Sequence, residues 1–391
     1  MVKTSFQKLS ALVIMVTFLL TSCQKNDHSL QSLSQDSNRK GKDLSENLNA
    51  GKKIGHFTQT NLVSDVAGWA THTDPTLINA WGLAWAPTGI AWIGSQGGHV
   101  SNVYNSEGST VLGPVNIPSP GGTTGGNPTG VVFNSSTGFV LSTGGPARFI
   151  FVGVDGVVSA WNGSKGVNAQ RIATVPLSSF TGATIAHNGT DTLLYAANFG
   201  AGKISVWNKT WTAVNLSFMD PMIPAGFSPF NIQNVGNMLY VTYAKVGSDG
   251  RSQAGDGLGY VDIYWPNGTL SKRFASTGSL NAPWGVAMAP AGYLPVDSDD
   301  DDNAASQPTI LIGNFGNGRI NAFSTSGKFL GQLRGDNHQI LSIDELWAIM
   351  FPPSTSTIDQ KRLYFTAGPE EEAHGLFGYL LPKPVEMDDN D

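Results

Sequence analysis

Apolar and polar residues alternate in short runs along most of this chain, and turns rich in Gly, Asn and Asp separate the runs. Such period-two runs predict β-strands, whereas helical periodicity is nearly absent beyond residue 22. One pattern, a strand that opens on Asn-Ala just before a Trp, occurs at 79–84 and again at 281–287. A second, a strand that runs into a Gly-rich hairpin, occurs at 194–204 and at 311–320. Self-similarity of this kind predicts a repeat architecture.

The repeats define six units. Their first strands align on an aromatic residue or its substitute, and the aligned positions, 46 to 63 residues apart, are Trp81, Thr129, Thr184, Phe230, Trp284 and Trp347. A unit of this length holds four short strands, and such small sheets bury both faces only when they pack radially. The sequence therefore predicts an all-β fold, a six-bladed β-propeller of four-stranded antiparallel blades. The last unit has only three strands, so we expect the N-terminal segment 56–63 to complete the last blade and close the ring.

Composition agrees with one large ring. Only 13% of the 391 residues are charged, against about 25% in average domains, as expected when inner strands are buried on both faces. The 47 glycines suit hairpin turns with positive φ. The net charge is −6 and no basic stripe is visible, which argues against nucleic acid as a partner.

The first 22 residues have the organisation of a signal peptide. Lys3 and Lys8 precede an apolar run of about ten residues, which is too short to span a membrane. Cys23, the single cysteine, follows at the position where bacterial lipoproteins are acylated, although an ordinary leader with an incidental cysteine is the alternative. We therefore expect an exported bacterial outer-membrane lipoprotein, anchored in the membrane by lipid at Cys23 and facing the periplasm or the cell surface.

Three further segments follow the leader. Residues 23–55 are rich in Ser, Asn, Gln, Asp and Lys and cannot bury a core, so we expect a flexible polar tether. The propeller is expected at 56–382, as a monomeric ring, and an acidic tail at 383–391.

Six long motifs stand out in the second half of the chain, at 228–234, 239–245, 281–285, 313–323, 363–369 and 372–378. They closely resemble an uncharacterised family of exported bacterial six-bladed propellers of the NHL-like type. The resemblance covers roughly residues 57 to 380 and implies the fold and export, but no activity. The chain departs from the family pattern at the acidic run 297–302, which looks like an insertion, and at Gly200, where the family has His.

Polar and aromatic residues gather at the strand starts and hairpins that would share one face of the ring. A concave mouth with convergent polar groups is the default binding-site hypothesis. We expect ligand-binding residues among Trp81, Trp284, Trp347, Asn79, Asn281, His99, Asn198 and Asn314. The three tryptophans could form an aromatic rim for a sugar or apolar ligand, or wedge between neighbouring blades with each indole N–H bonded to a carbonyl.

Two acidic clusters are candidate catalytic or metal sites. Glu372 and His374 share one hairpin and could supply a general base or hold Mg²⁺ or Ca²⁺, although a charged, exposed hairpin is ordinary. Asp297, Asp299 and Asp301 have the alternating spacing of a weak Ca²⁺ site. The position-6 Gly and position-12 Glu of an EF-hand are missing, and a solvated insertion is the alternative.

Three functions stay open at this stage. The first is an envelope protein that binds a ligand or protein partner through the polar face without catalysis. The second is a metal-assisted lyase or hydrolase with a His/Glu site near the axis, by analogy with lyases of propeller architecture. The third is a structural module of an envelope complex, which would expose an apolar patch. The sequence has no nucleophile elbow, phosphate loop or HExxH motif, so we expect the first.

Overall fold

Strands make up nearly all of the regular structure, as the period-two pattern predicts. The computed structural model describes residues 54–294 and 307–383, which form 26 strands and one short 3₁₀ helix, η1 (Gly163–Lys165). No helix in this part of the chain is long and apolar enough to cross a membrane. The all-β expectation is confirmed. Outside the described residues lie the expected leader, most of the tether, nearly all of the tail, Cys23, Asp297, Asp299 and Asp301.

Hydrogen bonds join the described strands into five sheets, of which four are antiparallel and built from consecutive strands. The first contains β3 (Ala80–Trp85), β4 (Ala91–Ser95), β5 (Val100–Tyr104) and β6 (Thr110–Asn116). The second contains β7 (Pro128–Phe133), β8 (Phe149–Gly153), β9 (Val157–Trp161) and β10 (Gln170–Thr174). The third contains β11 (Phe180–Asn188), β12 (Asp191–Asn198), β13 (Lys203–Asn208) and β14 (Ala213–Val214). The fourth contains β15 (Phe227–Val235), β16 (Met238–Val246), β18 (Gly259–Tyr264) and β19 (Leu270–Ser276), with β17 (Ser252–Gln253) beside β16.

The fifth sheet joins the two ends of the described chain. In spatial order it contains β20 (Pro283–Ala289), β21 (Thr309–Asn314), β22 (Ile320–Ser324), β23 (Phe329–Gly335), β1 (Ile54–Ser64), β26 (Leu376–Pro382), β25 (Leu363–Ala367) and β24 (Leu346–Met350), with β2 (His72–Thr73) beside β1. β1 pairs antiparallel with β26, the neighbour expected for the segment 56–63. β1 also pairs parallel with β23, so one N-terminal strand joins two antiparallel groups of strands.

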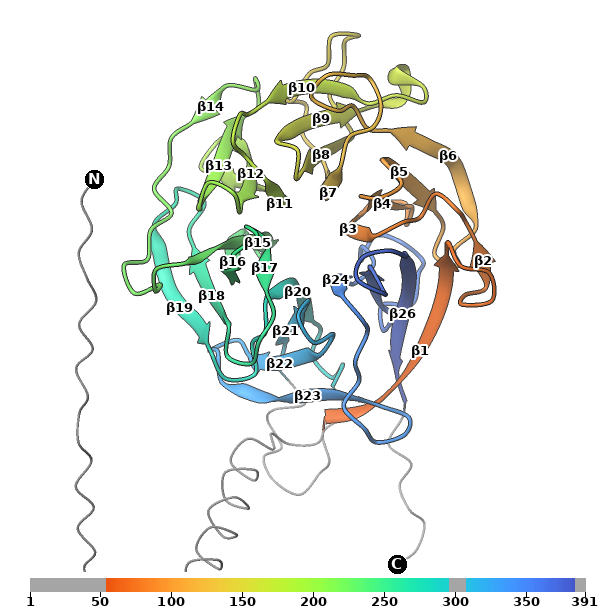
Figure 1. The fold of residues 1–391 in the computed structure, drawn as a ribbon, viewed down its shortest axis with the longest axis vertical. Helices are drawn as coiled ribbons and strands as arrows, with labels where there is room; N and C mark the ends of the chain where they lie inside the picture. The colour runs from red at the N-terminus through yellow and green to blue at the C-terminus, as the bar shows by residue number, and fades with distance from the viewer. Residues whose placement is uncertain (1–53, 295–306, 384–391) are drawn as a thin grey trace, which may run out of the picture. The chain divides into compact units, whose positions relative to one another are not determined.

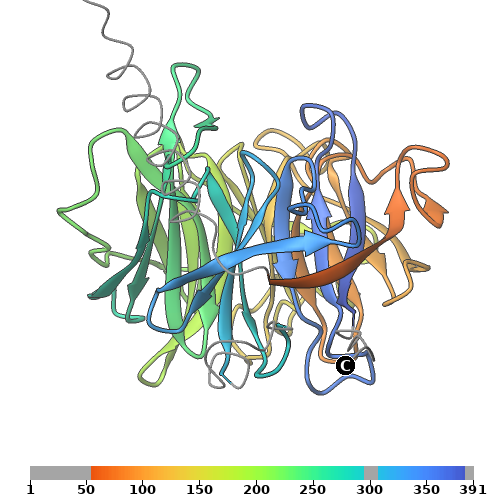
Figure 2. The ribbon, with the colours of Figure 1, turned by 90° about the horizontal axis from the view of Figure 1, so that it is seen from below.

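The four-stranded groups stand radially around a common axis, which makes the fold a β-propeller (Figure 1). The strands nearest the axis are β3, β7, β11, β15, β20 and β24. Seen from the side, the inner strands run along the axis and the connecting loops gather at the two faces of the ring (Figure 2). The residues at the strand ends on one face can therefore converge on the axis.

Every inner strand carries a β-bulge near its start, where its register with the next strand shifts. The bulges include or adjoin Trp81, Thr129, Thr181, Phe230, Trp284 and Trp347. The alignment of Thr184 in the third unit is wrong, because the register shift in β11 comes three residues earlier, at Thr181. A bulge releases backbone groups from the ladder, and side chains of other inner strands bind them. Trp284 Nε1 donates to Thr181 O at 2.9 Å, and Asn231 Nδ2 donates to Trp284 O at 2.8 Å.

Glycines let neighbouring inner strands approach more closely than a side chain would permit. A Cβ at Gly82 would lie 2.2 Å from the carbonyl oxygen of Thr129, on the next inner strand. A Cβ at Gly285 would lie 2.8 Å from the carbonyl oxygen of Trp347. Neighbouring inner strands therefore lie in close backbone contact around the axis.

We expect Gly82→Ala to destabilise the fold by about 2–3 kcal/mol, because the added methyl group would overlap a backbone oxygen that moves only if β7 moves. Gly113→Ala is the matched control, since a Cβ at this exposed strand position meets nothing within 4 Å. The control should change stability by less than about 0.5 kcal/mol. Urea unfolding followed by tryptophan fluorescence measures both. Equal stabilities for the two variants would contradict the close packing of the inner strands.

Candidate functional site

A cluster of aromatic side chains fills the axis of the ring, with Trp347 at its centre. The Trp347 ring stacks on that of Trp81, with centroids 3.5 Å apart and planes at 16°, and on that of Phe315 at 4.1 Å. Trp284 and Phe230 contact the same indole edge-on or tilted, at 5.9 and 5.8 Å. Each of the three tryptophans is no more than 5% exposed. They are therefore wedged between inner strands, and the exposed aromatic rim that the sequence also allowed is not formed.

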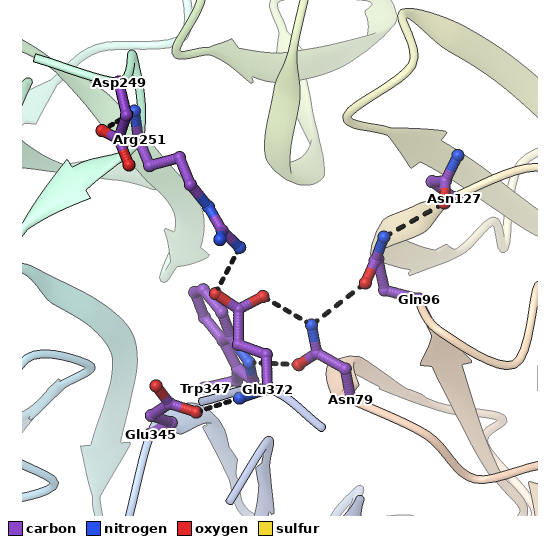
Figure 3. A network of polar contacts seen from close by, with 8 residues as sticks. All are labelled: Asn79, Gln96, Asn127, Asp249, Arg251, Glu345, Trp347 and Glu372. Carbon is purple, nitrogen blue, oxygen red and sulfur yellow. Dashed lines mark hydrogen bonds and ion pairs between the residues drawn. The ribbon is translucent and has the colours of Figure 1, made fainter. Parts of the chain in front are cut away.

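Above this aromatic cluster lies a hydrogen-bonded network of side chains from distant parts of the chain (Figure 3). Trp347 Nε1 donates to Asn79 Oδ1 at 2.8 Å, which fixes the orientation of that amide. Asn79 Nδ2 then donates to Glu372 Oε2 at 2.7 Å and to Gln96 Oε1 at 3.1 Å. Gln96 Nε2 in turn donates to Asn127 Oδ1 at 3.1 Å. The network thus links the starts of β3 and β7 to the hairpin before β26.

Glu372 is a mostly buried carboxylate that pairs with an exposed arginine. Arg251, from the loop before β17, donates to Glu372 Oε1 at 2.7 Å. The Glu372 side chain is 15% exposed and that of Arg251 is 66% exposed. Burial raises the pKa of Glu372, while the charge of Arg251 and the hydrogen bond from Asn79 act in the opposite direction. The site therefore holds a desolvated carboxylate whose ionisation depends on its polar neighbours.

A second carboxylate, Glu345, lies beneath the same hairpin. It accepts a hydrogen bond from the backbone N–H of Glu372. Burial raises the pKa of Glu345 to about 7, and the charges of Glu372, Asp344 and Glu371 act in the same direction. An acid with this pKa exchanges its proton near neutral pH, as a general acid or base requires.

The hairpin that carries Glu372 has an unusual backbone. Glu370, Glu371 and Glu372 all have left-handed conformations, with φ of 59°, 58° and 65°. Asn79 and Glu345, each two residues before an axial tryptophan, have φ of 47° and 49°. Residues other than glycine adopt this region at a cost, and such strain concentrates at functional sites. Three of these five residues, Asn79, Glu345 and Glu372, belong to the network, while Ala282, two residues before Trp284, has a similar φ of 42° outside it.

The network and the aromatic cluster together enclose a cavity of about 170 Å³. Typical sites for drug-sized ligands measure roughly 300–1,000 Å³, whereas a water molecule takes about 30 Å³. The cavity therefore suits a small molecule or the tip of one side chain. Its lining residues are Trp81, Gln96, Val154, Ser179, Thr181, Phe199, Phe230, Gly250, Arg251, Ser252, Trp347 and Glu372.

His374 does not join Glu372, although the two residues are neighbours on one hairpin. His374 Nδ1 lies 2.8 Å from Asp65 Oδ2, and its ring packs edge-on against Trp69 in the loop after β1. Its other nitrogen lies 3.6 Å from Glu370. Across residues 54–294 and 307–383, three or more His, Cys, Asp or Glu side chains are nowhere grouped so as to hold a metal ion. The structure thus separates the two members of the expected His/Glu pair.

The other candidate polar residues are hydrogen-bonded to neighbouring loops of the protein. Asn198 and Asn314, both fully buried at the ends of second strands, bind groups near the start of the adjacent inner strand. Asn281 accepts from Gly255 N and donates to Asp256, and His99 Nδ1 lies 2.9 Å from Gly126 O. Of the ligand-binding candidates, Trp81 and Trp347 line the cavity and Asn79 bonds to its walls.

Sequence reasoning missed several lining residues. Phe199 follows Asn198 as Phe315 follows Asn314, so the repeat itself marked Phe199 as an axial residue. Ser179 and Ser252 carried no comparable signal, because an isolated serine in a loop is common.

Glu345 should make stability fall as pH rises. Its folded-state pKa of about 7 exceeds its usual 4.5, so the folded protein keeps a proton that the unfolded chain releases between these values. The stabilisation is complete below pH 4.5 and is lost as pH rises to 7. Over this interval the free energy of unfolding of the wild type should fall by on the order of 1 kcal/mol more than that of Glu345→Gln, after discounting for solvent screening. Denaturant unfolding of both proteins at the two pH values measures this; parallel profiles would contradict it.

Comparison with solved structures gives only distant similarities. A streptogramin B lyase matches with 12% identity and a TM-score of 0.48, over 85% of this chain and 99% of that one. A Bacteroides thetaiotaomicron protein of unknown function matches with 10% identity and a TM-score of 0.49, over 85% and 74%. The Pan2 WD40 domain of Neurospora crassa matches with 10% identity and a TM-score of 0.45, over 85% and 97%. Similarities at this level carry no inference about what the chain does.

Sequence relatives are closer. No family model matches the chain. The uncharacterized protein R648 of Acanthamoeba polyphaga mimivirus is 30% identical over 343 residues, which are 83% of this chain and 80% of that protein. The uncharacterized protein L690 of the same virus is 30% identical over 342 residues, 83% of this chain and 85% of that protein. Both relatives are viral, so they give no support to the expected bacterial origin. The chain belongs to the same family as the uncharacterised mimivirus proteins R648 and L690.

Proposed function

We propose that the ring has six blades, each opened by one inner strand, and that β1 supplies the fourth strand of the last blade. The antiparallel pairing of β1 with β26 supports this assignment, and the parallel contact of β1 with β23 would then be a contact between neighbouring blades. The NHL-like motifs of the sequence favour the same count. The blade assignment places the cavity at the axis, where the ends of the inner strands meet.

We infer that this propeller is a binding module whose axial cavity takes a small ligand or one side chain of a protein partner, without catalysis. The observation that carries this proposal is the buried Glu372 carboxylate, held between Asn79 and Arg251 over an aromatic floor. A concave site that combines apolar walls with oriented polar groups is typical of ligand binding. The strained hairpin supports the same interpretation, because strain of this kind is retained where it positions functional groups.

A second candidate is acid–base catalysis in the same cavity. It is favoured by Glu345, which lies next to the cavity, accepts a hydrogen bond from the backbone N–H of the lining residue Glu372, and has a pKa raised by burial to about 7. The metal-assisted lyase or hydrolase expected as the alternative has less support, since His374 and Glu372 turn to different partners. Turnover that is lost in Glu345→Gln while binding persists would favour catalysis.

To test the binding role, we would fill the cavity with Ser252→Phe, a lining position, and compare it with Ser109→Phe at an exposed turn. Titration calorimetry with a panel of small amines, sugars and carboxylates should show saturable binding of at least one class. Affinity should fall at least about tenfold in Ser252→Phe and stay unchanged in Ser109→Phe, because only the first side chain occupies the cavity. Binding by no class, or equal binding by both variants, would overturn the proposal.

We also propose that Cys23 is acylated and that the tether anchors the ring to a bacterial outer membrane, where an envelope ligand or protein meets the cavity. The lysines, the short apolar run and the single cysteine support this. Expressed in a bacterial host with labelled palmitate, the wild type should incorporate label and sediment with membranes. Cys23→Ser should do neither, while folding equally well. Labelling of Cys23→Ser, or no labelling of the wild type, would contradict the anchor.

A further inference from the structure

The lining of the axial cavity indicates the chemical class of its ligand, and this step rests on the binding role proposed above. We propose that the ligand carries a compact cationic head, an ammonium or a guanidinium, which replaces Arg251 as the partner of Glu372. Arg251 then occupies the position that the cationic head of the ligand takes when it binds.

Glu372 is fixed by several contacts and the Arg251 guanidinium by one. This difference indicates which member of the pair a ligand can replace. Glu372 is mostly buried, accepts from Asn79, and is tied through its backbone N–H to Glu345. Arg251 is 66% exposed, and Glu372 is the one partner that its guanidinium finds among the described residues. An exposed arginine gains little from such a pair, whereas a buried carboxylate without a cation is strongly unfavourable. A ligand cation can therefore take the place of Arg251 while Glu372 stays in position.

The charges around the cavity favour a cation over an anion. Arg251 is the one basic residue among the described residues that line it. The charges of Asp344, Glu371 and Glu372 all act on the neighbouring Glu345. Among the described residues, Glu372 is the one acidic side chain that lines the cavity, and a cation that takes the place of Arg251 is attracted to it, whereas an anion is repelled.

Aromatic side chains form much of the remaining wall of the cavity. Trp81, Phe199, Phe230 and Trp347 line it, and a low-dielectric wall of this kind strengthens the attraction between a cation and Glu372. A volume of about 170 Å³ accommodates one ammonium or guanidinium group with a few further atoms.

Calorimetric titration of the purified protein with four probes tests the inference: ethanolamine, methylguanidine, glucose and acetate, at equal ionic strength. The two cations should bind, and glucose and acetate should not. Arg251→Gln should bind the cations about tenfold more tightly, because it frees Glu372. Glu372→Gln should bind them at least tenfold more weakly. Lys245→Gln is the control, since Lys245 is a basic residue of the same sheet that does not line the cavity, and it should behave as the wild type.

The possible failures are distinguishable. Binding of glucose or acetate that Ser252→Phe abolishes, with no binding of the cations, would overturn the cationic ligand and leave the binding role standing. Binding of no probe to the wild type or to Arg251→Gln would overturn the cationic ligand, and the wider panel would then decide the binding role. If Glu372→Gln fails to fold, Arg251→Gln decides alone: a cation affinity no higher than that of the wild type overturns the inference.

Discussion

The Trp347 indole is the side chain on which the arrangement at the axis depends. Glycines such as Gly82 bring neighbouring inner strands into close backbone contact, and the stacked rings of Trp81 and Trp347 pack at the axis that these strands surround. Because the Trp347 N–H has a single direction in which to donate, it binds Asn79 Oδ1 and so turns the Asn79 amide group toward Glu372. Packing of apolar rings in the core thereby fixes the orientation of the polar site above it.

This dependence explains why the site tolerates a buried carboxylate. An isolated carboxylate in such surroundings would be neutralised. Glu372 instead accepts from an amide held by the core and from a guanidinium that reaches in from solvent. One of these partners is fixed and the other is exposed. A site built this way keeps its acceptor oriented while the balancing charge stays accessible, which is the arrangement that a binding pocket for a cation requires.

The repeat in the sequence predicted much of the fold and less of the site. Aromatic residues, glycines and period-two runs marked the inner strands because packing at the axis demands those residue types. Thr184 was misplaced because the bulge position of its unit holds Thr181 and not an aromatic residue, and the place of a bulge depends on hydrogen-bond register that residue types do not encode. Asn314 and Glu372 are equally polar in the sequence, yet the Asn314 amide is hydrogen-bonded to Asn317 and to the loop before β20, while the Glu372 carboxylate lines the cavity. Loop conformation makes that difference, and three left-handed residues in a row are not predictable from Glu-Glu-Glu.

The closure of the ring and the integrity of the cavity are physically coupled. β1 pairs with β26 on one side and β23 on the other, so the N-terminal strand holds the seam between the two ends of the described chain. The hydrogen bond from Asn79 to Glu372 also joins the two ends of the described chain, between the start of β3 and the hairpin before β26, 293 positions apart. Loosening of β1 would let the hairpin before β26 move away from β3 and would separate the Asn79 amide from the carboxylate. The strand that completes the ring is therefore also part of what orients its candidate binding site.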